Sequence, residues 1–274
     1  SVREAVRRTP GIAAVSPSQE SPDGAVATFT ATPTTRPQDP ATTATLRRLR
    51  EQTLPRVAES TGMSTGVGGI TASDEDFTRV VASKLPLFVA IVVLLSAGLL
   101  LIVFRSVVIP VKAAAMNLLS IGAALGVVTA IFQHGVGAGL LGVGTGPIEW
   151  FLPVLLFAIV FGLSMDYEIF LLSRVREEWQ ASGDASAAVA RGLAGTGRVI
   201  TAAASIMIVV FAAFALSDDR LVKLFGVGLA SAILIDAVII RCLLVPALME
   251  LFGRHAWWMP RRLERLVPRM AGAH

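Results

Sequence analysis

The stretch Phe161–Arg176, which reads FGLSMDYEIFLLSRVR, decides how the chain folds. It places an acid, Asp166, and the adjacent Tyr167 in a run that has no other charge back to Phe151. A charged side chain at the centre of a bilayer costs about 3 kcal/mol on insertion scales, so such an acid normally faces the protein interior or a water path. We therefore expect Asp166 to be a functional acid in a membrane-spanning helix. The alternative is a buried, hydrogen-bonded structural acid.

Composition supports a membrane protein with a smaller soluble part. The chain has 274 residues, of which 54% are hydrophobic and only 16% are charged, whereas about 25% of the residues of a soluble domain are charged. The net charge of +4 needs no nucleic-acid partner, because arginines cluster beside the apolar runs. The single cysteine, Cys242, excludes a disulfide within the chain.

Five apolar runs predict a polytopic α-helical membrane domain over residues 85–250. Each run is close to the roughly 20 residues that a helix needs to cross about 30 Å of hydrocarbon. The runs are Leu87–Phe104, Ala113–Phe132, Phe151–Ser173, Val199–Leu216 and Leu224–Val245.

Residues 1–84 predict a small α+β domain outside the membrane. We expect a short amphipathic helix before Pro10, a longer helix over Thr42–Ser60 that Pro55 kinks or splits, and a cap at Ser73 for the helix that leads into the first span. Alternating or β-rich segments predict three strands. The strands are Ile12–Val15, Gly24–Thr32 and Met63–Ile70.

The distribution of lysine and arginine predicts the orientation. The loops after spans one and three and the C-terminal tail form the basic side, whereas the opposite loops contain only Arg220 and Lys223. We expect the basic side to be cytoplasmic and the N-terminal domain to lie outside a bacterial cell membrane. The basic side contains Arg105, Lys112, Arg174, Arg176, Arg191, Arg198, Arg254, Arg261, Arg262, Arg265 and Arg269.

The tail, residues 251–274, mixes Trp257 and Trp258 with arginines. This composition predicts an amphipathic segment in the cytoplasmic interface, with tryptophan at the headgroups and arginine towards anionic lipid. The alternative is an unstructured basic tail. Because the chain starts in soluble-like sequence without a leader, we also expect it to be part of a longer protein.

The loop Gln133–Trp150 contains HGVGAGLLGVGTG. A phosphate-binding loop would need a preceding strand and a following helix, and neither is indicated. His134 has no second metal ligand at a useful spacing. We therefore expect a flexible outer loop, no cofactor and no metal.

Span five contains two further charged residues, Asp236 and Arg241. Five residues advance an α-helix by about 7.5 Å and turn it about 140° past a full turn, which predicts different faces and different partners. Alternatively, Arg241 reaches the cytoplasmic surface. Glu168 is expected to point away from Asp166, near the inner interface. Four polar residues are expected to form hydrogen bonds between helices or to join a proton relay: Asn117, Ser120, Thr201 and Ser205.

GLSMDYEIFLLSRVREEW resembles the signature of the MMPL (mycobacterial membrane protein large) family of the resistance–nodulation–division (RND) superfamily. VFRSVVIPVKAAAMNLLSIGAALG, GRVITAAA, DDRLVKLFGVGLASAILIDAVIIR and WWMPRRL resemble that family too, in the same order, over about residues 60–268. The resemblance implies two repeats of six spans, each with an extracytoplasmic domain after its first span. This chain would be the C-terminal repeat without its first span.

The resemblance further implies an exporter of lipids or other hydrophobic molecules that is driven by the proton-motive force, and not an enzyme. In such proteins an Asp-Tyr pair from each half relays protons. Asp166 and Tyr167 match the second pair, and Asp236 and Arg241 match the acid and base of the last span. The implied partners are protons, the lipid bilayer, a lipid-like substrate and the missing N-terminal half, so this chain alone is not expected to transport.

Three other classes remain as alternatives. An intramembrane aspartyl protease also needs two membrane-embedded acids, but its GxGD pattern differs from SMDY and LIDA in this chain. A sterol-sensing membrane domain would not depend on Asp166. A domain of the SecD/SecF type shares the superfamily but has different motifs, and neither of these two classes would export independently.

Overall fold

The computed structural model describes residues 1–37, 39–260 and 263. The chain divides into two compact units, Ser1–Ser83 and Lys84–His274. The fold is mainly helical, with strands only in the N-terminal unit among the described residues.

The N-terminal unit is a small α+β layer. Its strands form two antiparallel pairs, β1 with β4 and β2 with β3. Val6, Leu49 and Leu54 form its buried core. The elements are α1 (Val2–Arg7), β1 (Ile12–Val15), β2 (Gln19–Glu20), β3 (Ala27–Thr28), β4 (Ala31–Pro33), α2 (Pro40–Arg48), the π-helix η1 (Leu49–Thr53), α3 (Leu54–Thr61) and the first turns of α4 (Ile70–Phe104).

The strand predicted at Ile12–Val15 is confirmed, but three predictions for this unit are wrong. Gly24–Thr32 contains β3 and the start of β4 rather than one strand, and Met63–Ile70 forms no strand. Glycines at 62, 66, 68 and 69 disfavour an extended strand because glycine loses the most backbone entropy on ordering. Helix α4 starts at Ile70, so Ser73 lies inside it and is not a cap.

Two arginines tie the start of α4 to the helices before it. Arg47 Nη2 lies 2.6 Å from Glu75 Oε1. Arg50 makes a two-point contact with Asp76, at 2.5 Å and 2.8 Å. A forked guanidinium–carboxylate contact fixes orientation as well as distance.

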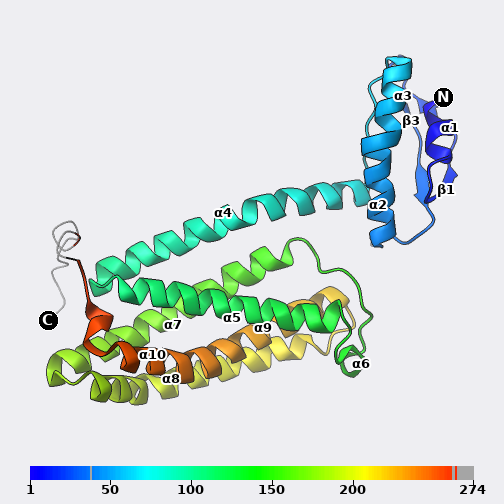
Figure 1. Ribbon diagram of the computed structural model, residues 1–274. Coiled ribbons are helices and arrows are strands. Elements are labelled where there is room, and N and C mark those ends of the chain that lie inside the picture. The colour runs from blue at the N-terminus through cyan, green and yellow to red at the C-terminus, as the bar shows by residue number, and fades with distance from the viewer. Residues whose placement is uncertain (38, 261–262, 264–274) are drawn as a thin grey trace. The chain divides into compact units, whose positions relative to one another are not determined.

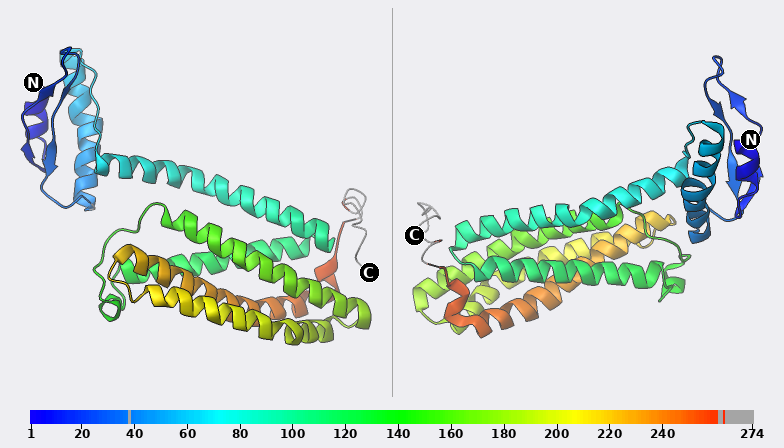
Figure 2. Two further views of the ribbon diagram at one scale, coloured as in Figure 1. Left: turned by 180° about the vertical axis from the view of Figure 1, so that it is seen from behind. Right: turned by 45° about the horizontal axis from the view of Figure 1, so that its top comes forward.

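The second unit is a helical bundle (Figures 1 and 2). The views agree that α5, α7, α8 and the continuous run of α9, η2 and α10 lie side by side. Five helical segments in the described part of the chain are long and apolar enough to cross a membrane, as predicted. The elements are α4 from Lys84, α5 (Val108–Phe132), α6 (Ala138–Leu141), α7 (Leu152–Ser182), α8 (Ala185–Phe214), α9 (Arg220–Leu234), the π-helix η2 (Ile235–Leu244), α10 (Val245–Phe252) and the 3₁₀-helix η3 (Gly253–Trp257).

Glycines allow α7, α8 and α9 to approach one another closely. A Cβ atom on Gly192 of α8 would lie 2.6 Å from a methyl group of Val175 on α7. A Cβ atom on Gly226 of α9 would lie 2.6 Å from the Phe211 carbonyl oxygen on α8. Small residues at such crossings let membrane helices pack by close contact.

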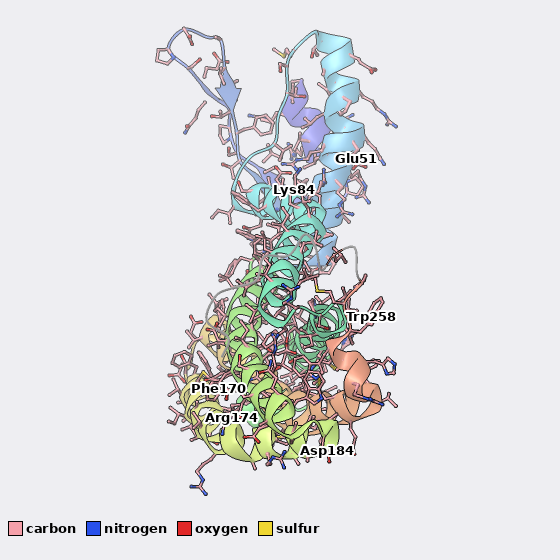
Figure 3. The ribbon with its side chains drawn as sticks, turned by 90° about the vertical axis from the view of Figure 1, so that its left-hand side faces the viewer. Glu51, Lys84, Phe170, Arg174, Asp184 and Trp258 are labelled. Atoms are coloured by element: carbon pink, nitrogen blue, oxygen red, sulfur yellow. The ribbon has the colours of Figure 1, made fainter. Side chains whose placement is uncertain are left out.

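At one end of the bundle, α7 turns into α8 through only two residues, and the segment after α10 packs nearby (Figure 3). Trp257 stacks on Trp179 with ring centroids 5.4 Å apart. Ser106 Oγ donates to the Ala256 carbonyl oxygen at 2.6 Å. Trp257 therefore packs against α7, and the position of the tail at the membrane interface stays a prediction. Trp258 is exposed, and the other tail arginines (Arg261, Arg262, Arg265 and Arg269) lie outside the described residues.

The loop between α5 and α7 lies at the other end of the bundle (Figure 1). Its only helix among the described residues is the four-residue α6. The two basic residues of this end hold the loop, because Lys223 donates to the Leu141 carbonyl oxygen at 2.6 Å and Arg220 donates to that of Pro147 at 3.0 Å. These contacts give the loop a defined attachment to α9.

Candidate functional site

The candidate site is built around an ion pair between Asp236 and Arg241. Arg241 Nη2 lies 2.7 Å from Asp236 Oδ2, and the side chains of Arg241 and Asp236 are only 4% and 9% exposed. Both residues belong to η2, inside the last membrane-length run of the bundle. Each charge therefore has its counter-ion within the same helix.

The prediction that Asp236 and Arg241 occupy different faces is wrong. It assumed an α-helix, whereas Ile235–Leu244 is a π-helix with hydrogen bonds that span five residues, as from Val245 N to the Ile240 oxygen. Residues five apart therefore lie about one turn apart on the same side. π-Helical segments often occur at functional sites.

Ser164 of α7 connects this ion pair to α5. Its Oγ lies 2.9 Å from Asp236 Oδ1 and 2.6 Å from Asn117 Oδ1. A hydroxyl has a single proton to donate, so Ser164 serves one of these two acceptors at a time. Ser120, also on α5, faces the Ala232 carbonyl oxygen at 3.5 Å. The predicted interhelical role of the α5 polar residues is confirmed.

Tyr167 and Ser164 also contact the guanidinium of Arg241. Arg241 donates to the Ser164 carbonyl oxygen at 2.9 Å. Its guanidinium carbon lies 4.9 Å from the centre of the Tyr167 ring, a distance typical of a cation–π contact. A cavity of about 10 Å³ touches Tyr167, Asp236 and Arg241, which is the room for one water molecule.

Asp166 lies apart from this cluster, on the exposed face of α7. Gly162, one turn before it, and Phe170, one turn after it, are exposed on the same face. Among the residues that the structure describes, none forms an ion pair with Asp166. Of the four predicted site residues, the structure therefore brings together Tyr167, Asp236 and Arg241.

An aspartyl protease needs two carboxylates that face a common cleft. Here Asp236 is buried against Arg241, while Asp166 is on the outer face of α7. Asp166 and Asp236 therefore do not form the pair of acids that such a protease needs.

A second buried ion pair, between Lys112 and Glu168, was not predicted. The prediction that Lys112 lies in a cytoplasmic loop is wrong, because it lies on α5, and its Nζ is 3.6 Å from Glu168 Oε1 of α7. The helical spacing of the residues could have shown that Glu168 lies on the buried face of its helix. It falls four residues after Ser164 on the face of α7 that also carries Phe161, Leu171 and Val175, all buried.

Thr201 and Ser205 of α8 are exposed and do not join the polar cluster, so their predicted link between helices of this unit is not seen. His134 is an exposed loop residue. In the described ranges, no group of three or more His, Cys, Asp or Glu residues is placed to hold a metal ion. Cys242 is a free, exposed cysteine.

Comparison with known proteins identifies the family. The sequence model of the MMPL family matches residues 3–271. The chain is 40% identical over 267 residues to the heme uptake protein MmpL11 of Mycobacterium tuberculosis, covering 97% of this chain and 27% of that protein. It is 39% identical over 267 residues to the mycolic acid-containing lipids exporter MmpL11 of Mycolicibacterium smegmatis, covering 97% and 28%.

The chain is also 40% identical over 209 residues to the trehalose monomycolate exporter MmpL3 of Mycolicibacterium smegmatis, covering 76% of this chain and 21% of that protein. It spans about a quarter of the length of these curated relatives. These relatives are named for heme uptake or for lipid export. The chain belongs to the MMPL family.

Proposed function

We propose that this chain is the proton-coupling part of a bacterial membrane exporter of lipids or other hydrophobic molecules, driven by the proton-motive force. The observation that carries the proposal is the Asp236–Arg241 ion pair, which is buried among helices of membrane length. Ionisable residues inside a membrane bundle mark ion or proton pathways. The relatives are named for transport, so transport rather than enzymatic chemistry is proposed.

Each residue of the cluster has a role in this proposal. The Asp236 carboxylate binds one proton and becomes a neutral acid, which releases its hold on Arg241. Ser164 then turns its hydroxyl from Asp236 towards Asn117, the other acceptor within reach. The contact between Tyr167 and Arg241 keeps the guanidinium in place. Loss of the proton to the opposite side restores the ion pair.

Asp166 is assigned to the contact with a second half of the transporter. Its side of α7 is exposed in this unit, and the chain spans about a quarter of the relatives' length. The family resemblance implies an Asp-Tyr pair in the other half. We propose that this pair covers Asp166 in the whole protein and exchanges protons with it, so that the chain alone does not transport.

The relatives differ in what they are named for: heme uptake, mycolic acid-containing lipids and trehalose monomycolate. Heme and these lipids share a large apolar body with polar groups. We propose a substrate of that kind for this transporter.

The test uses the longer protein that contains this chain, reconstituted in lipid vesicles with an imposed pH gradient. Trehalose monomycolate and hemin serve as separate probes. We expect Asp236→Asn and Asp166→Asn to lower gradient-driven transport at least tenfold, because neither amide can bind and release a proton. Asp218→Asn, which removes the same charge at an exposed position, serves as the matched control and should transport as the wild type does.

Undiminished transport by both membrane variants would overturn the proposal. Export would then not depend on protonation of these two acids. Transport that ignores the pH gradient in the wild type would have the same consequence.

A further inference from the structure

The Lys112–Glu168 pair is the second buried pair of charges in the helical unit, and the proposed relay does not use it. Its side chains are 3% and 6% exposed, less than most apolar side chains of the bundle. The Nζ–Oε1 distance of 3.6 Å is longer than the 2.7–2.9 Å of a charge-assisted hydrogen bond. Among the described atoms, neither Nζ nor Oε1 has a hydrogen-bond partner.

A contact with this geometry is poorly suited to holding α5 and α7 together. Removing two charges from water is costly, and the attraction between them compensates only when the geometry is good and the remaining donors and acceptors are satisfied. Here the contact is long and both facing atoms lack hydrogen bonds. A well-packed apolar pair of similar size would often hold α5 and α7 at least as well. The free hydrogen-bonding capacity instead suits a water molecule or a moving proton.

The second pair is next to the first. Glu168 follows Ser164 by four residues on the buried face of α7, about 6 Å along the helix axis. Arg241 and Asp236 of η2 act electrostatically on the Glu168 carboxylate, as does Lys112 of α5. The charged and titratable groups that face Glu168 from the neighbouring helices are therefore these three.

The buried polar groups of the two ion pairs form a series that leads towards one end of the bundle. Lys112 lies near the start of α5, one turn after the segment that joins α4 to α5, whereas Asn117 lies deeper in the same helix. The buried polar groups therefore run from Asn117, Ser164 and Asp236 to Glu168 and Lys112. They approach the end of the bundle where α7 turns into α8.

We propose that Glu168 is a second proton-binding site of the relay and that Lys112 positions it. The O–H bond of protonated Asp236 breaks, the proton crosses to the Glu168 carboxylate, and a new O–H bond forms there. Glu168 then releases the proton to water at the end of the bundle near the start of α5. Lys112 keeps its own proton throughout. The charges of the two cations and the two carboxylates of this cluster cancel. A proton that binds to either carboxylate therefore gives the cluster a net charge of one positive unit. This inference rests on the proposed function.

The test measures the pH dependence of gradient-driven transport by the whole reconstituted protein, with trehalose monomycolate as the probe. We expect Glu168→Gln to lower transport at least tenfold and to flatten its pH profile. Glu168→Asp, which keeps the carboxylate, should restore part of the rate with a displaced pH midpoint. Lys112→Met should displace the midpoint, and Lys112→Arg should return it towards the wild type. Glu177→Gln on α7, where the acid is mostly exposed, is the matched control and should keep the wild-type profile.

The double variant Lys112→Met/Glu168→Leu separates a structural role from proton binding, because it replaces the pair with apolar side chains. If it elutes as a folded, monodisperse protein and transports with the wild-type pH profile, the inference is overturned. The same holds for a wild-type profile in Glu168→Gln. If the Glu168 and Lys112 variants do not behave as expected but Asp236→Asn still lowers transport, the inference fails and the proposed function stands. Wild-type transport by Asp236→Asn and Asp166→Asn would overturn the function itself.

Discussion

The Asp236–Arg241 pair combines a large desolvation cost with good geometry. Both charges are buried, yet Arg241 also donates to the Ser164 carbonyl oxygen and contacts the Tyr167 ring. The energy of such a pair is therefore spread over four side chains rather than held in one bond. Removing a single member leaves the other charges and donors without partners.

We expect Asp236→Ala to destabilise the protein by about 3–5 kcal/mol, because Arg241 would remain as an uncompensated buried charge. The joint variant Asp236→Leu/Arg241→Met should be much closer to the wild type. The measurement is the order of apparent melting temperatures of the purified protein in detergent. Arg8→Ala, which removes an exposed pair with Glu4, is the control and should shift the temperature least. An Asp236→Ala protein as stable as that control would contradict the expectation.

For single residues, the sequence indicated which side chains are charged within the apolar runs, but not which of these side chains pair with one another. Asp236 and Arg241 were recognisable as charges in an apolar run, but their contact depends on π-helical geometry that residue types do not specify. Lys112 was predicted to lie in a loop because it follows Pro110 closely and lies near the end of the preceding helix, where composition is equally consistent with a loop. Its burial depends on Glu168 of another helix, which spacing within α5 cannot reveal.

At the scale of elements, the five membrane helices follow directly from their apolar runs, but their ends do not. Helix α7 continues nine residues beyond the predicted Ser173, through charged residues that pair with one another: Arg174 with Glu177 and Glu178. Such pairs three and four residues apart stabilise a helix in water. The short strands of the N-terminal unit were less predictable because each depends on a partner strand.

Alanine substitutions at two glycines of α8 test helix packing, because we expect them to have opposite effects on stability. Gly192→Ala places a methyl group 2.6 Å from a Val175 methyl and 3.0 Å from its Cα, and such overpacking costs typically about 1–3 kcal/mol. Gly197 has no atom within 4 Å of an added Cβ. Alanine there should be neutral or stabilising because it favours a helix by up to about 1 kcal/mol over glycine.

The measurement is the folded fraction of each variant in fluorescence-detected size-exclusion chromatography after graded heating. We expect Gly192→Ala to lose its monodisperse peak at a lower temperature than the wild type, and Gly197→Ala to keep it at least as long. Equal behaviour of the two variants would show that α7 and α8 do not need this close approach.

At the scale of the whole molecule, the two ends of the bundle differ in charge. Lys112 is buried and no longer counts towards the basic side, but Arg174, Arg176, Arg191 and Arg198 lie on the helices that flank the α7–α8 turn. At the other end, Arg220 and Lys223 donate to loop carbonyl oxygens. The asymmetry therefore persists after this correction. By the positive-inside rule it favours a cytoplasmic α7–α8 turn.

This orientation predicts which positions a membrane-impermeant maleimide reaches in intact cells. Cys242 is the only cysteine of the chain, so replacing it and any other cysteine of the longer protein gives a clean background. Single cysteines at Glu59 of the N-terminal unit, His134 of the outer loop and Ala181 near the α7–α8 turn are all at exposed positions. We expect Glu59→Cys and His134→Cys to be labelled in intact cells, and Ala181→Cys only after permeabilisation. The reverse pattern would invert the orientation. It would also reverse the direction of the proposed relay, because Glu168 would then release its proton outside the cell, against the gradient that is meant to drive export.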